Sequence, residues 1–157
     1  MFLILVSGII AFLYGLWFFG KDLPDYKELS KYNPKVVTRI HAGNGALLAE
    51  YAVEKRVFVP INVIPKTVID AFISAEDKDF YKHFGLDLKA TLRALLTNIK
   101  NIGSGKRLIG ASTITQQVAK NFLLSSEVSY ERKIKEAILS VRIERAFSKN
   151  QILELYL

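Results

Sequence analysis

The sequence contains no cysteine, one methionine, one tryptophan and four prolines among its 157 residues. The lack of cysteine excludes disulfide bonds and thiolate zinc sites, although it does not assign a cellular compartment. No zinc finger, RNA-recognition motif or basic zipper is present, so nothing in the sequence favours nucleic acid as a partner. No internal repeat is visible either. A chain of this length is sufficient for one domain with a hydrophobic core.

Charged side chains are missing from residues 1–20. A helix of that length, at about 1.5 Å per residue, roughly spans the hydrocarbon core of a bilayer, so we predict a transmembrane anchor there. Aromatic residues cluster at its far end, as they do at membrane interfaces: Tyr14, Trp17, Phe18 and Phe19. A cleaved signal peptide is the alternative, but a basic amino-terminal region and a cleavage site are not evident. Residues 21–28 hold two lysines against three acids, which favours a location of the remaining chain outside the cytoplasm.

The net charge of +7 is concentrated late in the chain. Residues 98–157 hold ten basic and five acidic side chains, whereas residues 21–97 hold twelve and ten. A basic surface attracts polyanions. On a protein tethered to a membrane, we expect these to be anionic lipid headgroups or a phosphorylated substrate.

Proline and glycine divide the remaining chain into a short amino-terminal part and a helical body. Residues 21–35 are predicted to form a linker, and residues 36–59 a β-hairpin that turns at Gly43-Asn44-Gly45. Asp87 is a predicted helix N-cap, and Ser148 with Gln151 fits a capping box. The predicted helices cover residues 65–83, 87–100, 112–124 and 129–147, and a further helix begins at residue 148. Because that helix would normally continue, we expect the polypeptide to be truncated.

Glu76 shares a face of the first predicted helix with three apolar residues, Ile69, Phe72 and Ile73. A carboxylate on an apolar face is costly to ionise, which suits a general acid or base near neutral pH. The alternative is a structural glutamate that reaches water or pairs with Lys78 or Lys82. Asp77 is expected to be solvated, and His83 by itself is more often a hydrogen-bonded structural residue.

Two later segments carry further polar groups. Within residues 110–121 (GASTITQQVAKN), hydroxyl and amide side chains that suit sugars lie on one helix face with a lysine that suits phosphate: Thr113, Gln116, Gln117 and Lys120. An ordinary solvent-facing surface is the alternative. The preceding basic loop, residues 103–107, fails the Walker spacing and is either a mobile cover for substrate or a surface linker. Arg132, Lys133 and Glu136 also share a face, either as a surface ion pair or as a carboxylate among cations beside an anionic leaving group.

Taken in order, these segments resemble the family 51 glycosyltransferases. Residues 76–85 (EDKDFYKHFG) match E-D-x-x-F-x-x-H-x-G, residues 110–117 match G-x-S-T-I-T-Q-Q, and residues 132–136 match R-K-x-x-E. Residues 149–157 begin a fourth motif and stop before its asparagine. The resemblance covers about residues 60–157. The stretch LPDYKELSKYNPKVVTRIHAGNGALLAEY also resembles the membrane-proximal region of class A penicillin-binding proteins.

The resemblance implies a mainly α, lysozyme-like glycosyltransferase domain, here incomplete at its carboxyl end, on the outer face of the bacterial cytoplasmic membrane. Such enzymes polymerise lipid II into β-1,4-linked glycan and release undecaprenyl diphosphate, often within a bifunctional transglycosylase/transpeptidase. The implied catalytic residues are Glu76, as the base, and Glu136. The implied substrate-binding residues are Asp77, Phe80, His83, Ser112, Thr113, Gln116, Gln117, Lys120, Asn121, Arg132 and Lys133.

The implied partners are lipid II, the growing glycan strand, the membrane and cell-wall synthesis proteins, and not nucleic acid. No protein metal site is expected, but the resemblance allows a divalent cation, Mg²⁺ or Mn²⁺, at the diphosphate. Because the fourth motif is incomplete, residues 1–157 alone are expected to show little polymerase activity. Two alternatives remain: a lysozyme-like lytic transglycosylase or glycosidase, and an inactive membrane-tethered fragment. The cations at positions 120, 132 and 133 favour the transferase, because hydrolysis of a neutral sugar does not need them.

Overall fold

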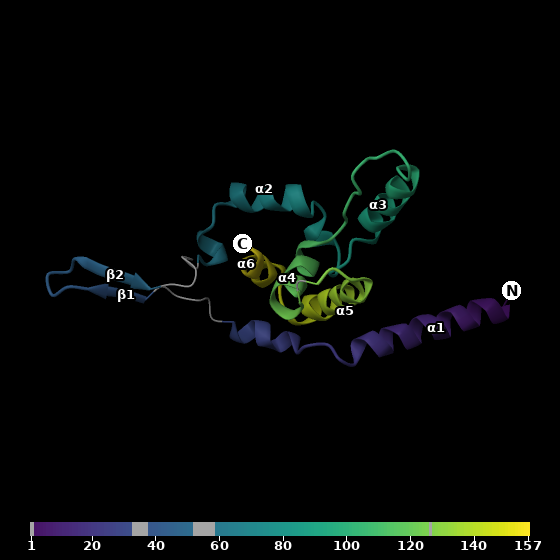
Figure 1. The fold of residues 1–157 in the computed structure, drawn as a ribbon, viewed down its shortest axis with the longest axis horizontal. Helices are drawn as coiled ribbons and strands as arrows, with labels where there is room; N and C mark the ends of the chain where they lie inside the picture. Colours follow the sequence, from purple (N-terminus) through teal and green to yellow (C-terminus); the bar gives the residue numbers. More distant parts are fainter. Residues whose placement is uncertain (1, 33–37, 52–58, 126) are drawn as a thin grey trace.

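The computed structural model describes residues 2–32, 38–51, 59–125 and 127–157, without the side chains of residues 2–5, 9, 11 and 12. The described chain is mainly α-helical, as predicted, with one small β-hairpin (Figure 1). The α-helices are α1 (Phe2–Gly20), α2 (Lys66–Glu76), α3 (Leu88–Lys100), α4 (Ile114–Leu123), α5 (Tyr130–Ala146) and α6 (Lys149–Tyr156). The strands are β1 (Thr38–His41) and β2 (Leu47–Tyr51), and short 3₁₀ helices are η1 (Tyr26–Lys31), η2 (Ile61–Val63) and η3 (Phe80–Lys82).

The helix predicted for the first twenty residues is present as α1, and its carboxyl end contacts α5. There, a guanidinium nitrogen of Arg142 donates to the carbonyl oxygen of Gly20 over 3.2 Å. Among the described residues, no helix meets the length and apolarity needed to cross a membrane. The transmembrane anchor predicted over residues 1–20 is therefore not confirmed.

The β-hairpin forms at the predicted turn. β1 pairs antiparallel with β2, and the register shifts between Ile40 and His41. Gly45 has φ +84°, a left-handed conformation that glycine adopts without steric cost. The flanking residues 33–37 and 52–58 of the predicted hairpin and linker lie outside the described residues. The linker prediction was wrong in one respect, because η1 packs against α5 and buries Leu29 in the core.

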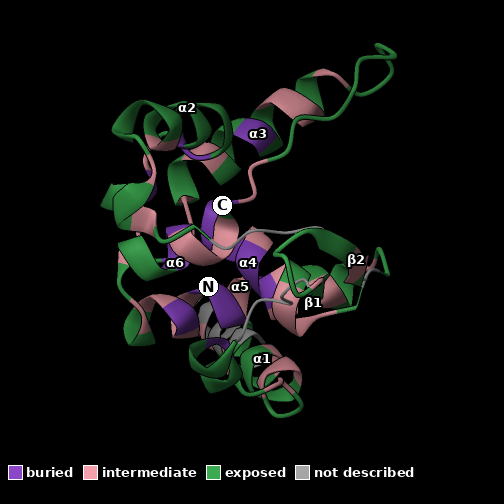
Figure 2. Ribbon diagram, turned by 90° about the vertical axis from the view of Figure 1, so that its left-hand side faces the viewer, coloured by how far each residue is buried: buried purple, intermediate pink, exposed green. Residues whose placement is uncertain are grey.

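The core lies where α4 packs against α5 and against α6 (Figure 2). Its fully buried side chains come from all three helices and from η3: Phe80, Ile114, Val118, Leu139, Ile143, Ile152 and Leu153. Each of the three helices begins at a capping hydroxyl, which satisfies backbone N–H groups that have no partner within the helix: Thr113, Ser129 and Ser148. The predicted capping box of Ser148 with Gln151 is confirmed.

α3 begins at the predicted N-cap, where Asp87 accepts a hydrogen bond from the backbone of Ala90 over 2.8 Å. It stands apart from the core together with the loop that follows it (Figure 1). Its apolar stripe is exposed in the structure, with only Ala94 buried: Leu88, Leu92, Leu95, Leu96 and Ile99.

The helix predicted over residues 65–83 ends early, at Glu76. Asp77 has φ −158° and ψ 72°, so the backbone leaves the helical conformation there and re-forms only a short 3₁₀ turn at η3. In the sequence, the helical spacing of apolar residues continues past Asp77. The helix ends because the side chain of Asp77 bonds to another part of the fold, as described below.

Candidate active site

Glu76 is the last residue of α2, and its side chain is exposed. The predicted apolar setting is therefore wrong: Ile73 is buried, but Phe72 is 44% exposed. The Glu76 carboxylate therefore lies outside the packed core. The Nε2 group of Gln117, on α4, donates a hydrogen bond of 2.8 Å to its Oε2 atom. Glu76 is thus an accessible carboxylate with one amide donor rather than a buried one.

Asp77 is buried, and the expectation that it is solvated was wrong. Its Oδ2 atom accepts a hydrogen bond from the backbone N–H of Ile114 over 3.1 Å, at the first turn of α4. Its Oδ1 atom lies 2.9 Å from Nε2 of His83. A carboxylate at a helix N-terminus is favoured by the helix dipole and by the free N–H groups there. Asp77 and His83 therefore tie the segment after Glu76 to α4, and both are largely withdrawn from solvent.

The end of that segment is fixed by Thr113 and Gly85. The Thr113 hydroxyl donates to the carbonyl oxygen of Gly85 over 2.7 Å and accepts from the backbone of Gln116. Gln116 completes a capping box by accepting from the backbone of Thr113. A Cβ atom at Gly85 would lie 2.6 Å from the carbonyl oxygen of Ser140, so only glycine fits. Thr113 and Gln116 are both buried, and their hydrogen bonds give them a structural role in addition to any contact with substrate.

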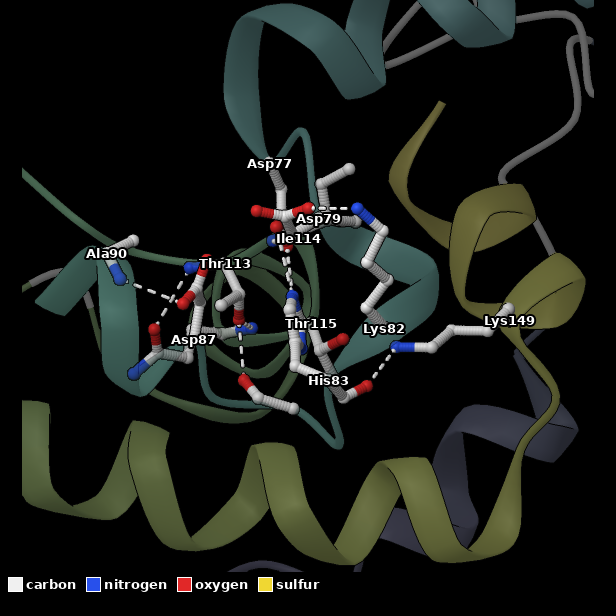
Figure 3. A network of polar contacts seen from close by, with 12 residues as sticks. Asp77, Asp79, Lys82, His83, Asp87, Ala90, Thr113, Ile114, Thr115 and Lys149 are labelled. Carbon is white, nitrogen blue, oxygen red and sulfur yellow. Dashed lines mark hydrogen bonds and ion pairs between the residues drawn. The ribbon is translucent and has the colours of Figure 1, made fainter.

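A partly buried ion pair between Glu144 of α5 and Lys149 of α6 links these helices to the same segment, and Figure 3 shows the Lys149 ammonium pointing at the backbone carbonyl of His83. Lys149 donates to Glu144 over 2.7 Å and to the carbonyl oxygen of His83 over 2.8 Å. The hydroxyl of Thr115 donates to the same carboxylate oxygen of Glu144 over 2.6 Å. The Lys149 ammonium also lies 4.2 Å from the centroid of the Phe80 ring. Phe80 is fully buried, so the predicted contact of Phe80 with substrate is not supported.

Sequence reasoning assigned no role to Lys149, Glu144 or Thr115. Thr115 and Lys149 lie inside the recognised motifs, and Glu144 lies between motifs. The available signal was a pair of opposite charges five residues apart across a helix boundary. Helical spacing cannot pair such residues in advance, because the direction of α6 relative to α5 is set by packing.

The third motif forms a second charged group. Glu136 is 1% exposed, and both of its oxygens are occupied: Arg132 binds Oε1, and Lys133 binds Oε2 over 2.6 Å. Lys133 also donates to the hydroxyl of Ser112 over 2.7 Å. The reading as a simple surface ion pair is therefore wrong. This carboxylate is buried, holds two cations in place and connects to the start of α4 through Ser112.

Lys120 and Asn121 lie farther along α4, where Lys120 is half-buried and Asn121 exposed. Within the described part of the chain, neither side chain has a hydrogen bond or an ion pair. Tyr156 of α6 stacks edge-on against Phe72, with ring centroids 6.2 Å apart. Burial and, to a smaller extent, the charge of Glu76 raise the pKa of Tyr156 above its usual value. Tyr156 therefore lies within electrostatic range of the candidate base, another relationship that sequence reasoning missed.

The described residues do not fit a divalent cation held by the protein alone. They contain no group of three or more histidine and carboxylate side chains placed to bind a metal. Glu136, the carboxylate beside the cations, already contacts Arg132 and Lys133 with both oxygens. No step of the chemistry below is therefore assigned to a metal ion.

Comparison with known proteins identifies the family of this chain. A family model described as transglycosylase matches residues 44–157. Penicillin-binding protein 1A of Rickettsia conorii is 58% identical over 157 residues, covering 99% of this chain and 20% of that protein. Penicillin-binding protein 1A of Aquifex aeolicus is 42% identical over 153 residues, covering 98% of this chain and 20% of that protein. The chain thus spans about a fifth of the length of the curated relatives that it matches.

Proposed function

Because this chain belongs to the transglycosylase family, we propose that it carries catalytic residues of a peptidoglycan glycosyltransferase that polymerises lipid II. The observation that supports this most is the position of residues 112–117. At one end, Ser112 accepts a hydrogen bond from Lys133 of the charged group formed with Arg132 and Glu136. At the other end, Gln117 binds the carboxylate of Glu76. One short segment thereby links an accessible carboxylate to a pair of fixed cations, and this transfer needs both.

In the proposed reaction, Glu76 takes the proton from the 4-hydroxyl of the acceptor N-acetylglucosamine. The resulting oxygen forms a bond to C1 of the donor N-acetylmuramic acid. The bond from C1 to the diphosphate oxygen breaks, and its electron pair leaves with undecaprenyl diphosphate. Attack from the opposite face inverts the α-linked donor to a β-1,4 bond. Glu76 is suited to the first step because it is exposed and has an oxygen that Gln117 does not occupy.

Arg132, Lys133 and Lys120 would stabilise the negative charge that develops on the leaving diphosphate. Cations fixed before the reaction do this without reorganising in the transition state. Arg132 and Lys133 are held by the buried Glu136, which accounts for a positioning role of that carboxylate. Lys120 has no ion-pair partner among the described residues and is half-buried, so its charge is available to phosphate.

We also propose, as the family resemblance implies, that the protein acts at the outer face of the cytoplasmic membrane, in which the polyprenyl chain of lipid II is held. By the names of the relatives, we also propose that the parent enzyme combines this activity with a penicillin-binding domain. Ser112, Asn121 and the free oxygen of the Gln117 amide are the proposed contacts to sugar. His83 and Asp77 are proposed to support the site rather than to bind the sugar directly.

The reaction class can be tested with labelled lipid II and the full-length gene product. We expect glycan strands of increasing length, with one lipid diphosphate released for each bond formed. The same preparation should leave preformed glycan strands intact. Shortening of preformed glycan without polymerisation of lipid II would instead identify a lytic transglycosylase or a glycosidase.

A further inference from the structure

The side chain of Gln117 contacts Glu76 across 41 positions of sequence, through the hydrogen bond of 2.8 Å between Nε2 and Oε2. Only the amide nitrogen of a glutamine can donate, so the contact also fixes which way the Gln117 amide faces. Among the described residues, this is the one hydrogen bond to the Glu76 carboxylate. The carboxylate therefore has one oxygen engaged and one oxygen open to a substrate hydroxyl.

Both ends of this hydrogen bond are held by neighbouring residues. Asp77, the residue after Glu76, binds the backbone N–H of Ile114 over 3.1 Å. Ile114 and Gln117 are three positions apart on α4 and thus lie on the same side of that helix. The end of α2 and the first turn of α4 are therefore joined by two adjacent bridges. The capping box of Thr113 and Gln116 keeps the α4 end of both bridges rigid.

The position of Glu76 at the end of α2 calls for a hydrogen-bond donor to its carboxylate. Glu76 is the last residue of α2, where the partial negative charge of the helix C-terminus disfavours a carboxylate. A donor that binds the charged form of a carboxylate favours that form and restricts its rotation. Gln117 supplies this donor from α4. A second carboxylate or a lysine at that position would instead repel Glu76 or bind it as an ion pair.

We propose that Gln117 is a positioning residue for Glu76: it orients the carboxylate through Oε2 and leaves the other oxygen for the acceptor hydroxyl. This role differs from the sugar contact that the family motif implies for Gln117. It rests on the proposed function, because Glu76 must act as the base for its orientation to affect the rate.

The kinetic test compares Gln117→Met, which has a similar length but no donor, with Asn121→Leu, which removes an amide one turn farther along α4. For Gln117→Met in the full-length gene product, we expect kcat for lipid II polymerisation to fall on the order of tenfold. The loss should fall on kcat, because the donor holds Oε2 of Glu76 and its removal leaves the base less well oriented at saturating substrate. For Asn121→Leu, which would lose a sugar contact, we expect the larger change in KM. A rise in KM for Gln117→Met with an unchanged kcat would show a sugar contact only and overturn the proposal.

The contact itself can be tested without any change at position 117. In ¹⁵N–¹H spectra, the side-chain NH₂ resonances of Gln117 should move when Glu76 is replaced by alanine, and should not move in Asp70→Asn, on the same helix. Unchanged Gln117 resonances in Glu76→Ala would overturn the proposal by themselves. The role of Glu76 as the base and the contact between Gln117 and Glu76 can fail separately. Full polymerase activity in Glu76→Gln would refute the proposed function, but it would not change the contact that the NMR spectra measure.

Discussion

Replacement of Lys149 by methionine should destabilise the protein strongly, because it leaves a buried charge without its cation. The side chain of Glu144 is 3% exposed, and its hydrogen bonds come from Lys149 and Thr115. Methionine matches the length of the lysine stem but cannot donate. After the change, the Glu144 carboxylate would retain one hydroxyl donor, and the carbonyl oxygen of His83 would lose its ammonium donor.

Removal of one partner from a buried ion pair typically costs about 3–5 kcal/mol. Because Lys149 itself is 20% exposed, we take the lower end, about 3 kcal/mol. For a protein of this size, each kcal/mol lowers Tm by about 2–4 °C, so the expected decrease is roughly 6–12 °C. Thermal unfolding followed by circular dichroism measures this directly, and urea unfolding gives the free energy.

Lys82→Met is the matched control, because Lys82 also pairs with a carboxylate but is 79% exposed. Exposed pairs are screened by water and salt, so Tm should change little. Lys149→Met combined with Glu144→Gln should cost less than the sum of the two single changes, because the second removes the stranded charge. Equal effects of Lys149→Met and Lys82→Met, or strict additivity with Glu144→Gln, would refute the reasoning.

Two further predictions concern the same region. Gly85→Ala should lower the free energy of unfolding by at least about 2 kcal/mol, because φ is +86° and the new Cβ would clash with the backbone of Ser140. Gly103→Ala is the control in urea unfolding, because Gly103 has φ +80° but lies in open space. The clash predicts a larger loss of unfolding free energy for Gly85→Ala than for Gly103→Ala. Equal losses would contradict the clash. Because the pKa of Tyr156 is raised in the fold, its contribution to stability is fully present below the ordinary pKa near 10 and decreases as pH rises through the folded value. Glu76→Gln should move the ionisation of Tyr156, followed by NMR, to lower pH; no movement would show that the two groups do not interact.

The sequence was a good guide to local structure, for physical reasons. Caps and turns depend on residues close in the chain, so Asp87, Ser148 and the Gly43–Gly45 turn were predictable. The mainly α class followed from periodicity in the same way. The early end of α2 was not predictable by these means, because a tertiary hydrogen bond from Asp77 to α4 overrides a periodicity that continues past residue 76.

The candidate site could likewise be predicted only in part. Resemblance to a family selected the segments that the structure brings together, including Glu76 with Gln117 and Lys133 with Ser112. It did not separate accessible residues from buried ones. Phe80 and Asp77 lie in the same motif as Glu76, and Thr113 lies in the second motif, but all three are buried because they hold the segment after α2 against the core. Burial depends on how distant helices pack, and a motif does not contain that information.

The role of Glu76 as the base is tested most directly by measuring polymerisation and lipid II binding separately in Glu76→Gln. The substitution removes the proton acceptor but retains the side-chain shape, and Asp70→Asn on the same helix is the control. We expect Glu76→Gln to lower kcat by about 10²–10⁴-fold while the Kd for lipid II changes by less than about threefold. Asp70→Asn should behave as wild type. Polymerisation by Glu76→Gln at the rate of Asp70→Asn would contradict the account.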